Sequence, residues 1–183
     1  MVKPSLFAAI AGTQARWVRI VFAGAAASLC VAQTAAADLA VAFDEGAPKD
    51  RFTFQNIGNC PISGAVLTLD LSGSAAGLIF DVTGQGAGVE VFQPLDVVDG
   101  ADALAGLPTA RDGDTQVAID IVALAPGDAI AFTIDVDDTA GGREITVSDA
   151  EIQGASVRID LAGATSTGVF EADARTMVRT GAC

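Results

Sequence analysis

Hydrophobic and polar residues alternate with a period of two along most of the chain after residue 38. Phe52 and Phe54, for example, alternate with polar neighbours. Successive side chains of a β-strand point to opposite faces of a sheet, so this alternation is typical of strands with one buried face and one face in water. No stretch shows a sustained helical stripe, and only 99–107 suits a short turn of helix. The alternation predicts strands near 39–43, 51–57, 65–71, 78–82, 88–92, 116–123, 129–136, 144–148, 151–161 and 168–178.

Turn-forming residues separate these runs, as in Asn56-Ile57-Gly58-Asn59, Pro126-Gly127 and Gly141-Gly142. Proline presets the backbone angle of a turn, and glycine tolerates a positive φ. Many short strands with regularly spaced turns predict an all-β fold, specifically an Ig-like antiparallel β-sandwich in which two sheets pack face to face. A jelly roll or a barrel is the alternative all-β architecture.

Residues 1–37 predict a cleavable signal peptide that precedes this sandwich. An apolar run follows an acid-free start, and Ala35-Ala36-Ala37 supplies the small-x-small pattern of a cleavage site. Cleavage between Ala37 and Asp38 would leave a single domain, 38–183, exported to the periplasm or the extracellular space. The basic residues of the start are Lys3, Arg16 and Arg19.

Two other interpretations of the N-terminal segment are a transmembrane anchor and a lipoprotein. The apolar run, 20–32, is shorter than the about 20 predominantly apolar residues of a stable span, and it is rich in Ala and Gly. Cys30 lies inside the run, but Leu29 precedes it where lipid attachment normally has Gly, Ala or Ser. We therefore expect no membrane span in the mature chain.

The predicted mature chain is strongly acidic. All 23 acidic residues follow position 37 and three of the ten basic residues precede it, which leaves seven basic side chains and a formal charge of −16 over 146 residues. This charge repels nucleic acid and anionic lipid headgroups, whose recognition relies on Lys and Arg. We expect no nucleic-acid partner. A solvated acidic surface is one interpretation of the charge, and an affinity for cations or basic partners is the other.

The residue types that are absent exclude several kinds of catalysis. The chain has no His and no Tyr, so a Ser-His-Asp or Cys-His arrangement is impossible and imidazole metal sites are excluded. Gly84, Gly86 and Gly88 form GxGxG without the later glycine or the following helix of a phosphate loop. We therefore predict no catalytic residues and a non-catalytic binding or adhesion module. A secreted hydrolase that uses paired carboxylates is the alternative, because the chain has many Asp residues.

Several segments resemble known surface modules. The run 51–58 followed by 67–71 resembles an early hairpin of Ig-like surface modules, and 124–127 followed by 131–136 resembles their late hairpin. Three segments are similar to bacterial exported proteins of the aggregation-factor core family: 77–82 (GLIFDV), 88–94 (GVEVFQP) and 132–138 (FTIDVDD). The family resemblance implies an extracellular adhesive or matrix role at the cell surface, with a protein or glycan partner and with calcium as a helper.

Asp135, Asp137, Asp138 and Glu144 form the set of residues best suited to a metal ion. Calcium takes about six to eight oxygen ligands, often from carboxylates and backbone carbonyls in a bent loop. The segment departs from an EF-hand loop, because Thr139 stands where the third acidic ligand is expected. Asp135 and Asp137 also alternate with apolar residues, as the wet face of a strand does. The pattern therefore predicts either a calcium site or a solvated strand edge.

The predicted mature chain keeps two cysteines, Cys60 and Cys183. Exported chains meet an oxidising environment and an even count favours pairing, so we expect a disulfide bond between them. This bond would tie the C-terminal residues to the sandwich. Two unpaired thiols, or an intermolecular bond through Cys183, are the alternatives.

Overall fold

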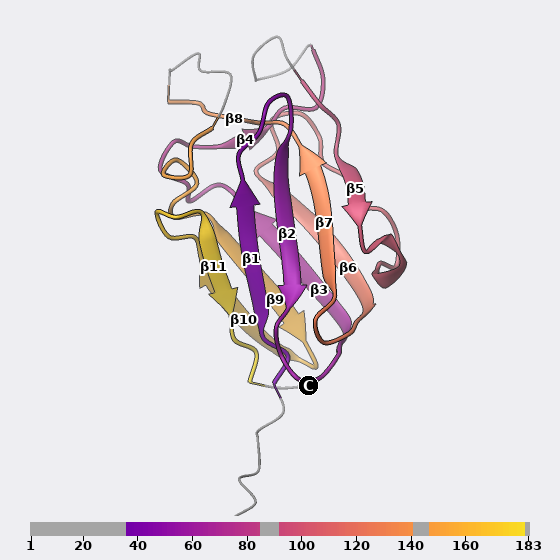
Figure 1. Cartoon of the computed structure of the whole chain (residues 1–183). Helices are drawn as coiled ribbons and strands as arrows, with labels where there is room; N and C mark the ends of the chain where they lie inside the picture. Colours follow the sequence, from indigo (N-terminus) through magenta and orange to yellow (C-terminus); the bar gives the residue numbers. More distant parts are fainter. Residues whose placement is uncertain (1–35, 85–91, 141–146, 182–183) are drawn as a thin grey trace, which may run out of the picture. The chain divides into compact units, whose positions relative to one another are not determined.

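The computed structural model describes residues 36–84, 92–140 and 147–181, all of which lie in one compact unit, Thr34–Cys183 (Figure 1). A short 3₁₀-helix, η1 (Ala101–Ala103), falls within the segment where the sequence predicts a turn of helix. The strands in the described residues are β1 (Leu39–Asp44), β2 (Asp50–Asn56), β3 (Ile62–Asp70), β4 (Ile79–Phe80), β5 (Asp96–Asp99), β6 (Gln116–Leu124), β7 (Ala129–Ile134), β8 (Val136–Asp137), β9 (Ser156–Leu161), β10 (Ala164–Val169) and β11 (Arg175–Val178).

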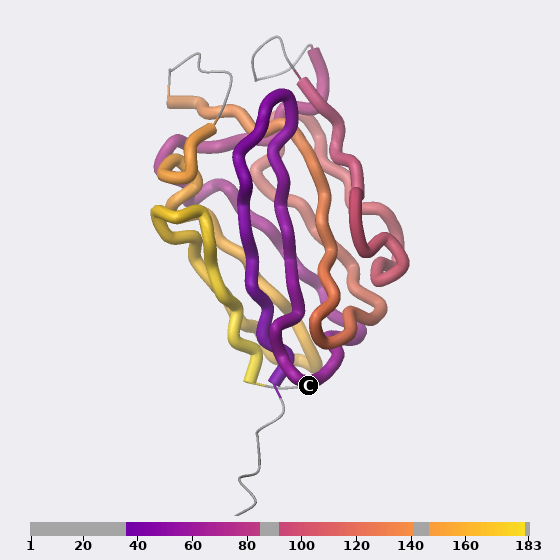
Figure 2. Tube along the Cα trace, viewed as in Figure 1, coloured from indigo at the N-terminus to yellow at the C-terminus, as the bar shows by residue number. Residues whose placement is uncertain are grey.

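The strands form two main antiparallel sheets and one short pair. The first sheet has the order β11-β1-β2-β7-β5, the second has the order β10-β9-β3-β6, and β4 pairs with β8. Figure 1 shows the first sheet in front of the second, and Figure 2 follows the same path along the backbone. The prediction of an all-β, Ig-like antiparallel β-sandwich is confirmed. The predicted signal peptide lies outside the described residues, apart from Ala36 and Ala37.

The alternation of the sequence places one face of each sheet in the core. In the first sheet Phe52 lies opposite Phe43 on β1 and Phe132 on β7, with ring centroids 5.0 and 5.3 Å away. In the second sheet Leu67 lies opposite Ile119 on β6. All five side chains are at most 1% exposed. Burial of such large apolar side chains is the main favourable contribution to folding, at about 25 cal/mol per Å² of apolar surface.

The predicted strand 168–178 is wrong, because the structure has two strands here in different sheets. β10 ends at Val169 beside β9, whereas β11 begins at Arg175 beside β1. Between them Ala174 has a φ of 56° and its N–H donates to the Glu171 carbonyl over 3.1 Å, which closes a turn. The chain crosses from one sheet to the other at this turn.

Other strand predictions differ from the structure at their ends. The prediction 151–161 starts too early, since β9 begins at Ser156 after a series of turns. In place of the single predicted strand 129–136, the structure has β7 and β8, which are separated by Asp135. The sequence did not predict β5, because its side chains are mostly exposed. Two further predicted strands lie largely outside the described residues, 88–92 and 144–148.

A buried amide closes one end of the sandwich. The Asn56 side chain is fully buried, and its Nδ2 donates to the carbonyls of Cys60 over 2.9 Å and Leu124 over 3.0 Å. Its Oδ1 accepts the N–H of Gly58 at 3.0 Å. One side chain thus pairs with three backbone groups, two in the loop after β2 and one at the end of β6. Buried polar groups require such partners. The predicted turn at 56–59 is held in this way.

Candidate functional site

Three aspartates meet where the short β4–β8 pair joins the sandwich. Ile79 and Phe80 of β4 lie opposite Asp137 and Val136 of β8, which brings the residue after β4, Asp81, beside β8. The Asp81 N–H donates to the Asp135 carbonyl over 3.0 Å. One carboxylate oxygen from each of Asp81, Asp135 and Asp137 lies within 4.8 Å of those from the other two. The backbone pairing therefore directs three acids at one point.

This group, which we call the aspartate cluster, is buried. Asp81 is 0% exposed, Asp137 is 4% exposed and Asp135 is 7% exposed. Neither carboxylate oxygen of Asp81 accepts a hydrogen bond from any group in the described part of the chain. A buried polar atom without a partner costs about 1–3 kcal/mol, and more when it carries charge. The arrangement is therefore unfavourable unless a proton or a cation joins it.

Two further aspartates hold the backbone around the aspartate cluster. Asp50 is 2% exposed, and its carboxylate accepts the N–H of Gly46 at 3.1 Å and of Val136 at 3.0 Å. Asp112 accepts the N–H groups of Val82 and Thr83, each at 3.1 Å, through one oxygen. These bonds fix the segment that follows Asp81 and the start of β8.

The surroundings disfavour the ionised form of three of these acids. Burial raises the pKa of Asp81 to about 7, and the neighbouring carboxylates of Asp112 and Asp137 add to the effect. Burial raises the pKa of Asp135 to about 7 as well, followed by the charges of Asp137 and Asp50. The pKa of Asp50 also rises to about 7 by burial, although its two backbone hydrogen bonds oppose the change. Raised pKa values of this kind mark sites where charge must be compensated.

The structure brings together only part of the predicted calcium set. Asp135 and Asp137 belong to the aspartate cluster, so their interpretation as a solvated strand edge is wrong. Asp138 is half-buried, and its Oδ1 accepts the N–H of Ala140 at 3.0 Å in a local turn. Glu144 lies outside the described residues. The sequence prediction missed Asp81, whose only signal was an acid at the end of an apolar run.

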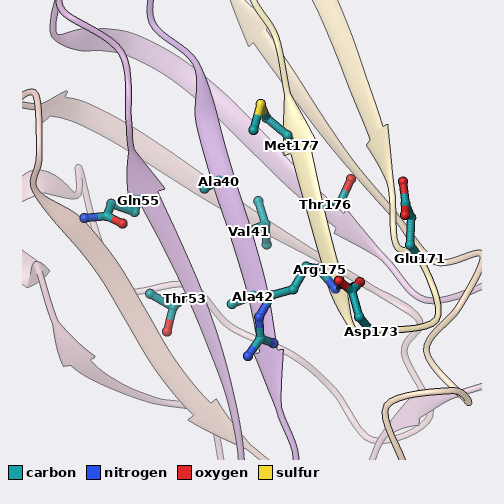
Figure 3. Close-up of a pocket in the computed structure, with 10 residues that line it drawn as sticks. All are labelled: Ala40, Val41, Ala42, Thr53, Gln55, Glu171, Asp173, Arg175, Thr176 and Met177. Atoms are coloured by element: carbon teal, nitrogen blue, oxygen red, sulfur yellow. Dashed lines mark hydrogen bonds between the residues drawn. The ribbon is translucent and has the colours of Figure 1, made fainter.

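A second feature is a hollow on the outer face of the first sheet (Figure 3). The register places Met177, Ala40 and Gln55 in one row across β11, β1 and β2, and it places Arg175, Ala42 and Thr53 in the next row. The middle member of each row is an alanine, so the floor is low between taller side chains. The hollow has a volume of about 380 Å³.

Polar groups surround the floor of this hollow. The Arg175 guanidinium donates to Asp44 at 2.6 Å and to the Phe43 carbonyl, so it is held against the rim. The Gln55 amide donates to the Gly127 carbonyl at 3.3 Å and is exposed. Glu171 and Asp173 add exposed carboxylates beside Arg175. Exposed donors, acceptors and methyl groups thus lie together on one concave surface.

The predicted cysteine pair is only half described. Cys60 is partly buried against the core, and Cys183 lies outside the described residues. The preceding residue, Asn59, exchanges two hydrogen bonds with Ala36, both of 2.9 Å. The Thr180 hydroxyl donates to the carbonyl of the next residue, Ala37, over 3.1 Å. The chain near the C-terminus therefore lies close to the loop that carries Cys60.

No protein-family model matches the chain, and no curated protein is significantly similar to it. In the described residues no helix is long and apolar enough to cross a membrane.

Several solved structures are similar in part. A family GH18 chitinase from Chromobacterium violaceum is 18% identical, with a TM-score of 0.33, and the match covers 73% of this chain and 19% of that chain. A biomass-sensing module of an Rsgi-like protein from Clostridium thermocellum is 14% identical, with a TM-score of 0.32. The match covers 70% of this chain and 95% of that module. The family 3a carbohydrate-binding module from the cipA scaffolding of that organism is 14% identical, with a TM-score of 0.29. The match covers 69% of this chain and 97% of that module. At these identities and scores the similarity assigns no ligand.

Proposed function

We propose that the protein is an exported, non-catalytic binding module that attaches to glycans at the cell surface or in the extracellular matrix. The observation that carries the proposal is the hollow on the outer face of the first sheet, with Ala40 and Ala42 as its floor. Binding sites of this kind combine apolar contact surface with a few placed polar groups. The adhesive role and calcium assistance implied by the aggregation-factor resemblance belong to the same proposal.

The chemistry of the hollow suits sugars. A sugar hydroxyl both donates and accepts hydrogen bonds, and the Gln55 amide and Thr53 hydroxyl can do the same. Carboxylates at Glu171 and Asp173 add acceptors. The methyl groups of the alanines and the Met177 side chain, which is 44% exposed, offer contact to the C–H face of a sugar ring.

The alternative of a hydrolase with paired carboxylates fits the aspartate cluster poorly. Glycosidase pairs are about 5–5.5 Å apart in retaining enzymes and about 6.5–9.5 Å apart in inverting enzymes. The oxygens of the aspartate cluster lie within 4.8 Å of one another, and the three side chains are at most 7% exposed. A polymer has almost no carboxylate surface to approach there.

The experiment is a binding titration of the exported protein with soluble cello- and chito-oligosaccharides and with surface polysaccharide from the source cells. Ala42→Leu fills the floor of the hollow, and Gln55→Ala removes an amide from its wall. Each is expected to weaken binding by about tenfold, the equivalent of one good hydrogen bond. Ala164→Leu, at an exposed position on β10, is the matched control and leaves binding unchanged. Binding that is equal in all four proteins, or no binding to any of these glycans, would reject the proposal.

A further inference from the structure

We propose that Asp81, Asp135 and Asp137 bind a calcium ion, which joins the segment after β4 to β8 at one end of the sandwich. The set shares two residues with the sequence prediction and replaces Asp138 and Glu144 by Asp81. This site is separate from the hollow proposed to bind glycans, because its ligands lie in or next to the β4–β8 pair and the hollow spans β11, β1 and β2.

The geometry of Asp81 is the first argument. Both of its oxygens are buried and accept no hydrogen bond in the described part of the chain, although Asp135 and Asp137 each place an oxygen within 4.8 Å. Like charges at this distance repel, and burial removes the water that would screen them. A cation at the point where the three carboxylates converge supplies the missing partner for Asp81 and cancels most of the repulsion.

The donor set selects the kind of cation. All three side chains offer carboxylate oxygen, and the protein contains no His, so a hard cation is favoured over zinc or copper. Three carboxylates supply up to six oxygens when each binds through both, which approaches the about six to eight ligands of calcium. Magnesium requires a stricter octahedron and keeps several waters, which a buried site accommodates poorly. Calcium is therefore the expected ion.

The surrounding bonds prepare the site. Asp50 binds the Val136 N–H, between the two β8-side ligands, and Asp112 binds the two N–H groups that follow Asp81. These outer carboxylates fix the backbone that carries the ligands, as the groups that hydrogen-bond to metal ligands do in known metal sites. The ion would thus hold the β4–β8 pair to β2, at the end of that strand opposite Asn56.

The test is a calorimetric titration of the EDTA-treated protein with calcium chloride and, separately, magnesium chloride, together with thermal melting. We expect one calcium per chain with a Kd below about 1 mM and magnesium at least about tenfold weaker. Saturating calcium should raise the melting temperature by about 3–6 °C, because it binds only the folded chain.

Variants identify the ligands. Asp81→Asn and Asp137→Asn should each abolish the calcium heat, and Asp81→Asn without calcium should melt no lower than the wild type, since an amide replaces a buried charge. Asp138→Asn and the exposed Asp120→Asn on β6 should bind calcium as the wild type does. No heat and no rise in melting temperature at about 10 mM calcium would overturn the proposal, as would unchanged binding in Asp81→Asn. If a variant does not fold, the wild-type titration alone decides, and oligosaccharide binding is measured in the same samples to keep the two proposals apart.

Discussion

Asp81 and Asp135 are joined by a backbone hydrogen bond, while their carboxylates lie close enough to repel each other. The Asp81 N–H donates to the Asp135 carbonyl over 3.0 Å, while their carboxylates face the same point within 4.8 Å. The strand-like pairing forces the two acids together, and nothing in the sequence spacing of 54 residues suggests it. Repulsion between them persists at neutral pH unless a proton or a cation is bound.

In the absence of divalent cations, we expect the protein to be most stable in mildly acidic solution. Asp50, Asp81 and Asp135 have pKa values of about 7 in the folded chain, against ordinary values of 3.8. Between these values the folded chain binds more protons than the unfolded chain, so the free energy of unfolding falls as pH rises. This contribution is complete below about pH 3.8 and is lost as pH rises through about 7. Thermal melting in EDTA between about pH 5 and about pH 8 measures it.

The same series in Asp81→Asn is the control for that pH dependence. The variant lacks the raised pKa of Asp81, so the fall in melting temperature with pH should become shallower. Glu45 and Asp137, which face Asp50, remain in the variant. A wild-type melting temperature that rises steadily across this range would contradict the prediction.

Replacing the buried amide at position 56 should destabilise the sandwich strongly. Asn56→Leu leaves the carbonyls of Cys60 and Leu124 and the N–H of Gly58 without their present partner. Each unsatisfied buried group costs about 1–3 kcal/mol, and water that enters the site relieves part of this cost. We therefore expect the free energy of unfolding to fall by about 3 kcal/mol. Urea unfolding measures the change. The exposed Gln153→Ala should change stability by less than about 0.5 kcal/mol, and an equally small effect in Asn56→Leu would be inconsistent with this account.

The disulfide between Cys60 and Cys183 stays a prediction, now with a structural reason. In the uncleaved chain Thr180 donates to Ala37 and Ala36 exchanges hydrogen bonds with Asn59, so Thr180 lies near the loop that carries Cys60. The bond in the mature chain requires this proximity to persist after Ala36 and Ala37 are removed. A bond closing a loop of this length is worth at most about 4–5 kcal/mol. Cys60→Ser should therefore lower the melting temperature of oxidised protein and leave reduced protein nearly unchanged. Two free thiols in protein taken from the periplasm or the medium, seen by mass spectrometry, would refute the bond.

Export is expected to produce a chain that begins at Asp38. Ala37 is fully buried and Ala36 exchanges two hydrogen bonds with Asn59, so cleavage after Ala37 removes contacts that the sandwich makes. A recombinant chain that starts at Ala36 should consequently melt a few degrees above one that starts at Asp38, since each bond contributes about 1 kcal/mol. The intact mass of the native exported protein checks the start. Recovery of the uncleaved chain from the membrane fraction would argue against it.

Alternation was sufficient to predict the central strands but not the connections between sheets. β2, β3 and β6 were predicted within three residues of their observed ends, because each buries alternate side chains over most of its length. The crossing at Ala174 depends on a local turn that leaves the apparent strand pattern unbroken. Mostly exposed edge strands such as β5 carry no core pattern at all.

The candidate site was harder to predict for a physical reason. Sequence patterns assume that acids face water, so Asp135 and Asp137 also fit a wet face, and Asp81 gave only the weak signal of an acid at the end of an apolar run. Their burial follows from β4 pairing with β8, which is a tertiary contact between short strands. The hollow could not be predicted without the strand pairing. Ala40 and Ala42 form its floor because larger side chains lie opposite them on β11 and β2.

Because β11 pairs with β1, the first sheet is complete only after the last strand of the chain has been synthesised. The first strand of the sandwich to be made has an open edge until residues 175–178 arrive more than 130 residues later. Such long-range pairing is slow, and an open edge invites aggregation or pairing with another chain. A chain carried across a membrane before it folds meets this risk only once, in the compartment where it finally works. Shortening β11 would leave this edge of β1 open in the folded protein as well, and it would remove the buried Val178 from the core.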